Sequence, residues 1–354
     1  MATWAYPWAP SRAASLPICC RTARPISTRR RFVRTASEAA VFRPRPPWWG
    51  GDLQTLRNSL LPAPKQIAGE RLYLAMADGS GDRLWALYNA GSDPNKPLVV
   101  LIHGLAGCED SSYIIAAAGF FLNHGYATLR LNLRGAGPSR PSCGLQSHAG
   151  RSRDLCDAIM ALPPATAAQG VVVVGFSLAG NMSLKFAAEY GHDLPVRALV
   201  TVSAPIDLAV TSANMLRPRN RLYNRKLLRD FRRECLAPGA IVSPPERAAI
   251  KAAGNFVELD DNFVAPRNGY RDAHDYWESC QARGFLAQIK LPTLMLHAHD
   301  DPIVPIGPCL QYPWEGNSYL FPEFSRFGGH VGFHGVGKRL WHLDRVLYFL
   351  TQML

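Results

Sequence analysis

The stretch Val171-Val-Val-Val-Gly-Phe-Ser-Leu-Ala-Gly180 is the most informative part of this chain. Four consecutive valines are typical of a buried β-strand, and the following residues up to Tyr190 have the apolar spacing of a helix. Ser177 therefore falls at a sharp strand-to-helix turn, which would expose its hydroxyl as a candidate nucleophile. Such a turn needs small residues on both sides of the serine, and Ala179 stands where glycine is usual. On this stretch alone, a purely structural serine remains the alternative.

Length, apolar content and charge limit the kinds of protein that this chain can be. The chain has 354 residues, of which 47% are hydrophobic, so it is long enough for one large domain or two modest ones. No apolar run approaches the roughly 18 residues that span a bilayer. The formal net charge is +12, and the first 37 residues contain seven arginines and no acidic residue. The remainder is only mildly basic and has no nucleic-acid-binding motif, so we expect no nucleic-acid partner.

The N-terminal segment, residues 1–41, is predicted to be a basic disordered tail. Its Arg-rich, Ser-rich and acid-poor composition also fits an organellar transit peptide or an upstream start codon. The eight cysteines form no C-x-x-C pair, which favours a reducing compartment over a disulfide framework. We therefore expect a cytoplasmic protein, with organellar targeting as the alternative.

The remaining chain, residues 42–354, alternates predicted strands and helices, which indicates an α/β domain with a mostly parallel sheet covered by helices on both faces. A hairpin is expected first, at 70–76 and 83–89, flanking a Gly-rich turn. Further strands are predicted at 97–103, 127–133, 170–175, 197–203, 292–297 and 317–321, and helices at 112–123, 178–190 and 338–350.

A helical cap, at about residues 209–285, is predicted as an insertion after the sixth strand, because this interval is too long for one crossover helix. It contains the basic stretch Arg217-Pro-Arg-Asn-Arg-Leu-Tyr-Asn-Arg-Lys226. These cations are expected to form a solvated face. The alternative is a peripheral contact with anionic lipid headgroups.

Two later loops supply partners for Ser177 in the chain order Ser, Asp, His. His330 lies in the Gly-rich segment after the last strand and is the predicted general base, with His334 as the alternative. Asp301 is the predicted orienting carboxylate, because it directly precedes Pro302 in an extended loop, with Asp300 as the competitor. A serine hydroxyl needs such a base within hydrogen-bond reach to become a nucleophile.

An oxyanion hole is expected from backbone amides of Leu105 and Leu178. Leu105 lies in the segment His103-Gly-Leu-Ala-Gly107, which follows a predicted strand, and Leu178 follows the serine. His103 itself is interpreted as a structural residue that shapes the loop.

Two other site types fit the sequence less well. The segment His297-Ala-His-Asp-Asp301 superficially resembles a metal-ligand cluster, but a metal site would leave the serine turn unexplained. The glycines of Arg134-Gly-Ala-Gly137 lack the Gly-Lys-Ser/Thr of a phosphate loop and are interpreted as a structural turn. We therefore expect neither a metal nor a cofactor.

The chain from about residue 42 onward resembles the YheT-like α/β-hydrolases, relatives of the ABHD lipases and of the yeast medium-chain ester synthase/esterases. Nine sequence blocks carry this resemblance, in the same order. They are Asp52-Leu-Gln-Thr-Leu56, His103-Gly-Leu-x-Gly107, Asn132-Leu-Arg-Gly135, His148-Ala-Gly-Arg-Ser-Arg-Asp-Leu155, Gly175-Phe-Ser-Leu-x-Gly-Asn-Met182, Val202-Ser-Ala-Pro-Ile-Asp-Leu208, Phe256-x-x-x-Asp-Asp261, Asp272-Ala-x-Asp-Tyr276 and Gly328-Gly-His-Val-Gly-Phe333.

This resemblance implies an α/β-hydrolase fold with an eight-stranded sheet, a triad of Ser177, Asp301 and His330, and carboxylic-ester substrates with short- to medium-chain or lipid acyl groups. The chain departs from the family at Ala179, at Ala106, where an acidic residue is frequent, and in its basic N-terminus. The predicted function is therefore a serine ester hydrolase. Transfer of the acyl group to an alcohol and a non-catalytic binding function remain alternatives.

Overall fold

The computed structural model describes residues 41–62, 64–338 and 340–354, and the predicted basic tail lies, apart from Val41, outside them. An eight-stranded sheet in the order β1-β2-β4-β3-β5-β6-β7-β8 runs through the molecule. The first two strands pair antiparallel and the others parallel, which confirms the predicted fold class. The strands are β1 (Glu70–Ala75), β2 (Arg83–Asn89), β3 (Leu98–Ile102), β4 (Thr128–Leu131), β5 (Val171–Phe176), β6 (Val196–Val202), β7 (Thr293–Ala298) and β8 (Leu320–Ser325).

Seven strands fall close to their predicted positions, and the prediction of 317–321 for the last one was wrong by about three residues. Strand β8 contains Pro322, which lacks the N–H group needed inside a sheet. Because β8 lies at the sheet edge and pairs only with β7, the proline is tolerated there.

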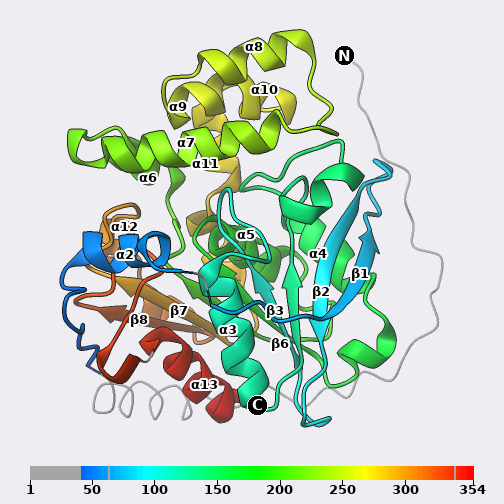
Figure 1. The fold of residues 1–354 in the computed structure, drawn as a ribbon, viewed down its shortest axis with the longest axis vertical. Helices are drawn as coiled ribbons and strands as arrows, with labels where there is room; N and C mark the ends of the chain where they lie inside the picture. The colour runs from blue at the N-terminus through cyan, green and yellow to red at the C-terminus, as the bar shows by residue number, and fades with distance from the viewer. Residues whose placement is uncertain (1–40, 63, 339) are drawn as a thin grey trace.

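The central strands are buried on both faces, so their side chains alternate between two hydrophobic clusters. Val172 and Val174 of β5 point to the cluster that contains α3 (Ser112–Asn123) and α13 (Trp341–Met353). Val171 and Val173 point to the cluster that contains α4 (Ser152–Met160) and α5 (Leu178–Glu189). A strand that is covered by helices on both faces needs apolar side chains on both, and the valine run supplies them. Figure 1 shows helices on both sides of the sheet.

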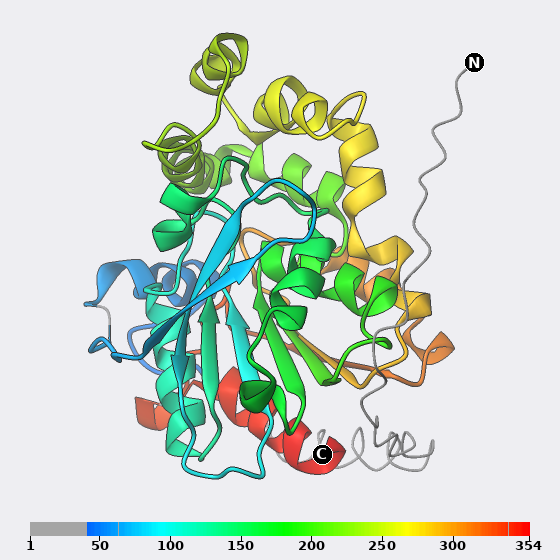
Figure 2. The ribbon, with the colours of Figure 1, turned by 90° about the vertical axis from the view of Figure 1, so that its right-hand side faces the viewer.

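Between β6 and β7 the chain forms a layer of helices that lies together beyond one end of the sheet (Figures 1 and 2). Its own hydrophobic cluster includes Leu228, Phe231 and Phe263. Its helices are α6 (Leu208–Met215), α7 (Arg221–Cys235), α8 (Pro244–Ala252), α9 (Phe256–Leu259), α10 (Ala265–Arg267) and α11 (Ala273–Cys280), with a π-helical turn at Asp260–Val264. We call this layer the cap; the domain limits of 42–354 and 209–285 stay predictions.

Two further α-helices lie outside the cap and the layers that cover the sheet. Helix α2 (Gly51–Leu60) precedes the sheet, and α12 (Gly307–Gln311) follows β7. Within the described residues, no helix combines the length and apolar character needed to cross a membrane.

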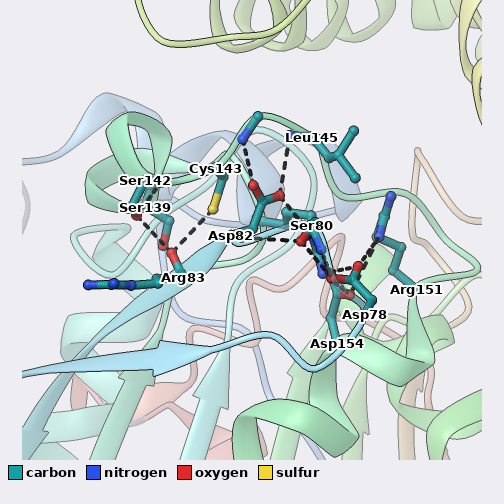
Figure 3. A network of polar contacts seen from close by, with 12 residues as sticks. Asp78, Ser80, Asp82, Arg83, Ser139, Ser142, Cys143, Leu145, Arg151 and Asp154 are labelled. Carbon is teal, nitrogen blue, oxygen red and sulfur yellow. Dashed lines mark hydrogen bonds and ion pairs between the residues drawn. The ribbon is translucent and has the colours of Figure 1, made fainter.

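A buried arginine joins the antiparallel hairpin to the parallel part of the fold. Arg134, in the turn after β4, is fully buried and donates hydrogen bonds to Asp154 of α4 at 2.9 and 2.8 Å. It also donates to Asp82 at 2.8 Å and pairs with Asp78 at 2.9 Å, both in the segment that connects β1 to β2. Figure 3 shows these three aspartates gathered in one network. Burial alone would lower the pKa of Arg134, but hydrogen bonds and charges of its partners raise it.

Replacing Arg134 with leucine should lower the free energy of unfolding by about 3–5 kcal/mol, because it leaves buried carboxylates without a cation. Urea denaturation of the purified variant measures this loss. Arg83→Leu is the matched control, since Arg83 is exposed in the same region, and it should change stability by less than about 0.5 kcal/mol. Equal stability of the two variants would show that the network contributes little.

Candidate active site

Ser177 lies between the end of β5 and the start of α5, with φ 54° and ψ −124°. A positive φ is strained for a residue with a side chain, and such strain clusters at functional sites. Ala179, the departure from the usual glycine, is almost completely buried among the core residues of α5. Its methyl group is therefore accommodated by packing, and the turn keeps its geometry.

Three side chains predicted to act together meet at this turn. His330 Nε2 lies 2.9 Å from Ser177 Oγ, and His330 Nδ1 lies 2.8 Å from Asp301 Oδ2. Both distances are within hydrogen-bond range, so the imidazole can accept the serine proton on one side while it donates to the carboxylate on the other. The three residues come from loops that follow β5, β7 and β8.

The two competing aspartates occupy different places. The Asp301 side chain is fully buried, and its Oδ1 accepts hydrogen bonds from the amides of Ile303 and Val304 at 2.8 and 2.9 Å. Burial alone would raise the pKa of Asp301, but the charge and hydrogen bond of His330 outweigh it and hold the pKa below its ordinary value. Asp300 instead accepts a hydrogen bond from the Gly329 amide at 2.8 Å, and its carboxylate therefore holds the histidine loop.

The predicted oxyanion loop lies directly against the serine. A Cβ atom on Gly104 would come within 2.9 Å of Ser177 Cβ, so this close approach requires glycine. The Gly104 amide donates to the Tyr113 hydroxyl at 2.9 Å, which anchors the loop to α3. Among the described residues, the backbone N–H groups of Leu105 and Leu178 have no hydrogen-bond acceptor, so both are free to donate to an oxyanion.

His103 shapes this loop from inside the protein. Its Nδ1 contacts the Gly104 carbonyl at 2.8 Å, and its Nε2 accepts a hydrogen bond from the Leu133 amide at 3.1 Å. Burial lowers its pKa to about 4, so the ring is neutral near pH 7. The two ring contacts require this neutral form, with a proton on Nδ1 only.

Helix α2, which the sequence analysis did not predict, holds the backbone of the histidine loop. The His330 amide donates to Thr55 Oγ1 at 2.8 Å, and Asn58 donates to the Val331 carbonyl at 3.3 Å. The buried Gln54 side chain bonds both the amide and the carbonyl of His334, at 2.7 and 3.2 Å. The block Asp52-Leu-Gln-Thr-Leu56 was the one sequence signal that could have pointed to these residues.

His334, the alternative base, is buried away from the serine. Its Nδ1 lies 3.1 Å from the Arg57 guanidinium, and burial with that neighbouring charge lowers its pKa to about 3. Within residues 41–62, 64–338 and 340–354, no three His, Cys, Asp or Glu side chains group as a metal site would require.

The cap closes over the catalytic end of the sheet with apolar side chains. Leu105, Ala106 and Leu178, which flank the serine and the oxyanion loop, pack against the cap's hydrophobic cluster. Ala106 therefore continues an apolar wall beside the nucleophile.

The family model described as alpha/beta hydrolase fold matches residues 97–327. The chain belongs to the α/β hydrolase fold family. YheT of Escherichia coli (strain K12), a protein named as an esterase, is 30% identical over 90% of this chain and 95% of its own length.

Two further comparisons agree with this membership. The medium-chain fatty acid ethyl ester synthase/esterase 2 of Saccharomyces cerevisiae is 23% identical over 72% of this chain and 62% of its own length. The solved structure of the Pyrococcus furiosus esterase Pf2001 has the same fold, with a TM-score of 0.55 and 17% identity over 83% of this chain and 98% of that one. The chain is thus an esterase-like α/β hydrolase by similarity.

Thr55→Val should lower kcat about 10- to 100-fold with little change in KM, because His330 loses the acceptor that fixes its backbone. Steady-state kinetics on a soluble p-nitrophenyl ester measures both constants. Thr55→Ser, which keeps the hydroxyl, should retain most of the activity. If valine and serine behave alike, the hydroxyl has no positioning function.

Acid should destabilise the fold through His103. Its pKa is lowered from 6.5 to about 4 in the folded state, so the unfolded chain binds the proton first as pH falls. Neutral His103 makes its full contribution to the free energy of unfolding above pH 6.5. This contribution, up to about 3 kcal/mol, is lost progressively as the pH falls toward 4.

The variant His103→Gln cannot titrate there, so its stability should depend less on pH over that window, whatever its stability at pH 7. Urea denaturation at several pH values measures this dependence. An unchanged pH dependence in the variant would mean that His103 is already protonated in the fold or exposed to solvent.

Proposed function

We propose that this chain is a serine carboxylic-ester hydrolase that works through an acyl-enzyme on Ser177. The observation that carries the proposal is the chain of two hydrogen bonds, at 2.9 and 2.8 Å, that joins Ser177 to His330 and His330 to Asp301. This arrangement activates a weak nucleophile by placing a base on its hydroxyl and a carboxylate behind the base. The similarity to proteins named as esterases supports the same reaction class.

In the first step, Ser177 Oγ attacks the ester carbonyl carbon while His330 Nε2 takes its proton. The carbonyl oxygen becomes an oxyanion, which the amides of Leu105 and Leu178 stabilise. The intermediate collapses by breaking the bond to the alcohol oxygen, and the departing alcohol takes the proton from His330. A water molecule then gives its proton to His330 and attacks the acyl carbon, and the proton returns to Ser177 as the acid leaves. Asp301 stabilises the imidazolium in both steps.

Substrates are proposed to carry an apolar acyl chain, short to medium in length or part of a lipid. The wall formed by Leu105, Ala106, Leu178 and the cap's hydrophobic cluster supports this preference, because it offers apolar contacts beside the nucleophile. The proposed chemistry uses no cofactor. A cytoplasmic location remains a prediction.

A second candidate reaction is acyl transfer to an alcohol, which the similarity to the yeast ester synthase/esterase favours. It differs only in the second step, where an alcohol replaces water on the acyl-enzyme. Product analysis with added ethanol separates the two reactions. Ethyl ester in excess of free acid indicates transfer, and free acid alone indicates hydrolysis.

Ser177→Ala should reduce ester turnover by about 10⁴-fold or more and abolish labelling by a fluorophosphonate probe, because the nucleophile is removed. Labelling and hydrolysis of p-nitrophenyl esters from acetate to palmitate measure both effects. Ser318→Ala, which removes an exposed serine, is the matched control and should behave as the unchanged chain. Labelling that persists in Ser177→Ala would contradict the proposal, and a folded chain that never labels would favour a binding function.

A further inference from the structure

The cap helix α7 presents a cationic outer face. Its buried side chains recur at Asn224, Leu228, Phe231 and Cys235, which places them on one side of the helix. The opposite side is exposed. By helical spacing it carries Leu222, Arg225, Lys226, Arg229 and Arg233.

Four large apolar side chains lie exposed where α7 meets helix α2. Single exposed apolar residues are common, but these four come from adjoining segments. Asp52 of α2 accepts hydrogen bonds from Arg219 and from the Tyr223 hydroxyl of α7, both at 3.0 Å, so the two helix ends are joined. The four are Trp49 (60% exposed), Leu53 (42%), Leu216 (50%) and Leu222 (76%).

The charge around them is mainly positive, and the acidic Asp52 at the junction is paired with Arg219. Residues 217–233 contain eight Arg or Lys residues and one acidic residue, Asp230. Asp230 pairs with Lys226 and Arg229 at 2.9 and 3.0 Å. Within residues 217–233, the exposed guanidinium groups that have no ion-pair partner among the described residues are those of Arg217, Arg221, Arg225 and Arg233. We call these four arginines and the four apolar side chains the docking face.

We propose that the docking face binds the surface of an anionic phospholipid bilayer. Cations beside protruding Trp and Leu side chains match a membrane interface. There the headgroup phosphates pair with the arginines, and the apolar side chains insert at the boundary with the acyl chains. A nucleic acid would satisfy the arginines but offers no comparable place for Leu216 and Leu222. An anionic bilayer is therefore the partner that can bind both the arginines and the apolar side chains of the docking face.

The docking face adjoins the catalytic machinery. Trp49 lies just before helix α2, Leu53 lies in its first turn, and Thr55 of the same helix holds the His330 amide. Asn220, directly before α7, donates a hydrogen bond to the carbonyl of Pro302, the residue after Asp301, at 2.9 Å. Docking would thus bring the membrane surface beside the site where an ester is proposed to react.

Vesicle sedimentation of the full-length Ser177→Ala chain tests the proposal, and because that chain is inert, the result does not depend on turnover. Vesicles of phosphatidylcholine alone are compared with vesicles of equal parts phosphatidylcholine and phosphatidylglycerol. We expect binding to the anionic vesicles, weakened by added salt, and little binding to the neutral ones. Equal binding to both, or binding to neither, would overturn the proposal.

Two variants in the same background locate the binding. Arg221→Glu/Arg225→Glu/Arg233→Glu should weaken partitioning onto anionic vesicles at least about tenfold, and Leu222→Ser should weaken it several-fold. The control Arg83→Glu/Lys251→Glu/Lys290→Glu changes the net charge equally on exposed residues elsewhere and should bind as the parent. The arginines of the first 37 residues are common to all variants, so only the differences report on the docking face. An equal loss in both triple variants, with unchanged thermal unfolding, would mean that overall charge alone drives binding.

Discussion

The position of the His330 ring is the constraint on which the site depends. The ring must bond Ser177 on one side and Asp301 on the other, so small displacements break one contact or both. The loop that carries it is rich in glycine and has little structure of its own. Its backbone is instead fixed from outside, by Asp300 through the Gly329 amide, by Thr55 through the His330 amide and by the Ser203 hydroxyl through the Val331 amide.

These supports come from widely separated parts of the chain. Asp300 follows β7, Ser203 follows β6, and Thr55 belongs to a helix that precedes the whole sheet. The fit of that helix is close, since a Cβ atom on Gly51 would collide with the Asp300 carbonyl. Contacts between distant segments therefore fix the orientation of the His330 ring before substrate binds. A flexible loop could not fix it by itself.

The sequence was informative where local chemistry decides the structure. The valine run of β5 and the helical spacing after Ser177 locate the turn, because burial on both faces and a strained serine leave a clear pattern. The choice of Asp301 over Asp300 also followed from a local cue, the Pro302 that extends the backbone. The buried carboxylate that bonds His330 in the structure is that of Asp301.

Helix α2 was not predicted from the sequence, and the reason is physical. Gln54 is its one fully buried residue, whereas the leucines at 53, 56 and 60, which recur at helical spacing, are exposed or half-buried. The apolar pattern of the helix therefore does not mark the face that packs on the protein. Gln54 and Thr55 are held by hydrogen bonds with residues about 275 to 280 positions away in the sequence. No local sequence pattern encodes such contacts. The cap was foreseen as a helical insertion, but its pairing with α2 through Asp52 depends on the same long-range geometry.

Mass spectrometry of the protein quenched during turnover of p-nitrophenyl butyrate would detect the acyl-enzyme itself. We expect a single butyryl group on the proteolytic peptide that contains Ser177. A butyryl group on another residue, or turnover with no covalent intermediate under conditions in which p-nitrophenol is released in a burst, would contradict it.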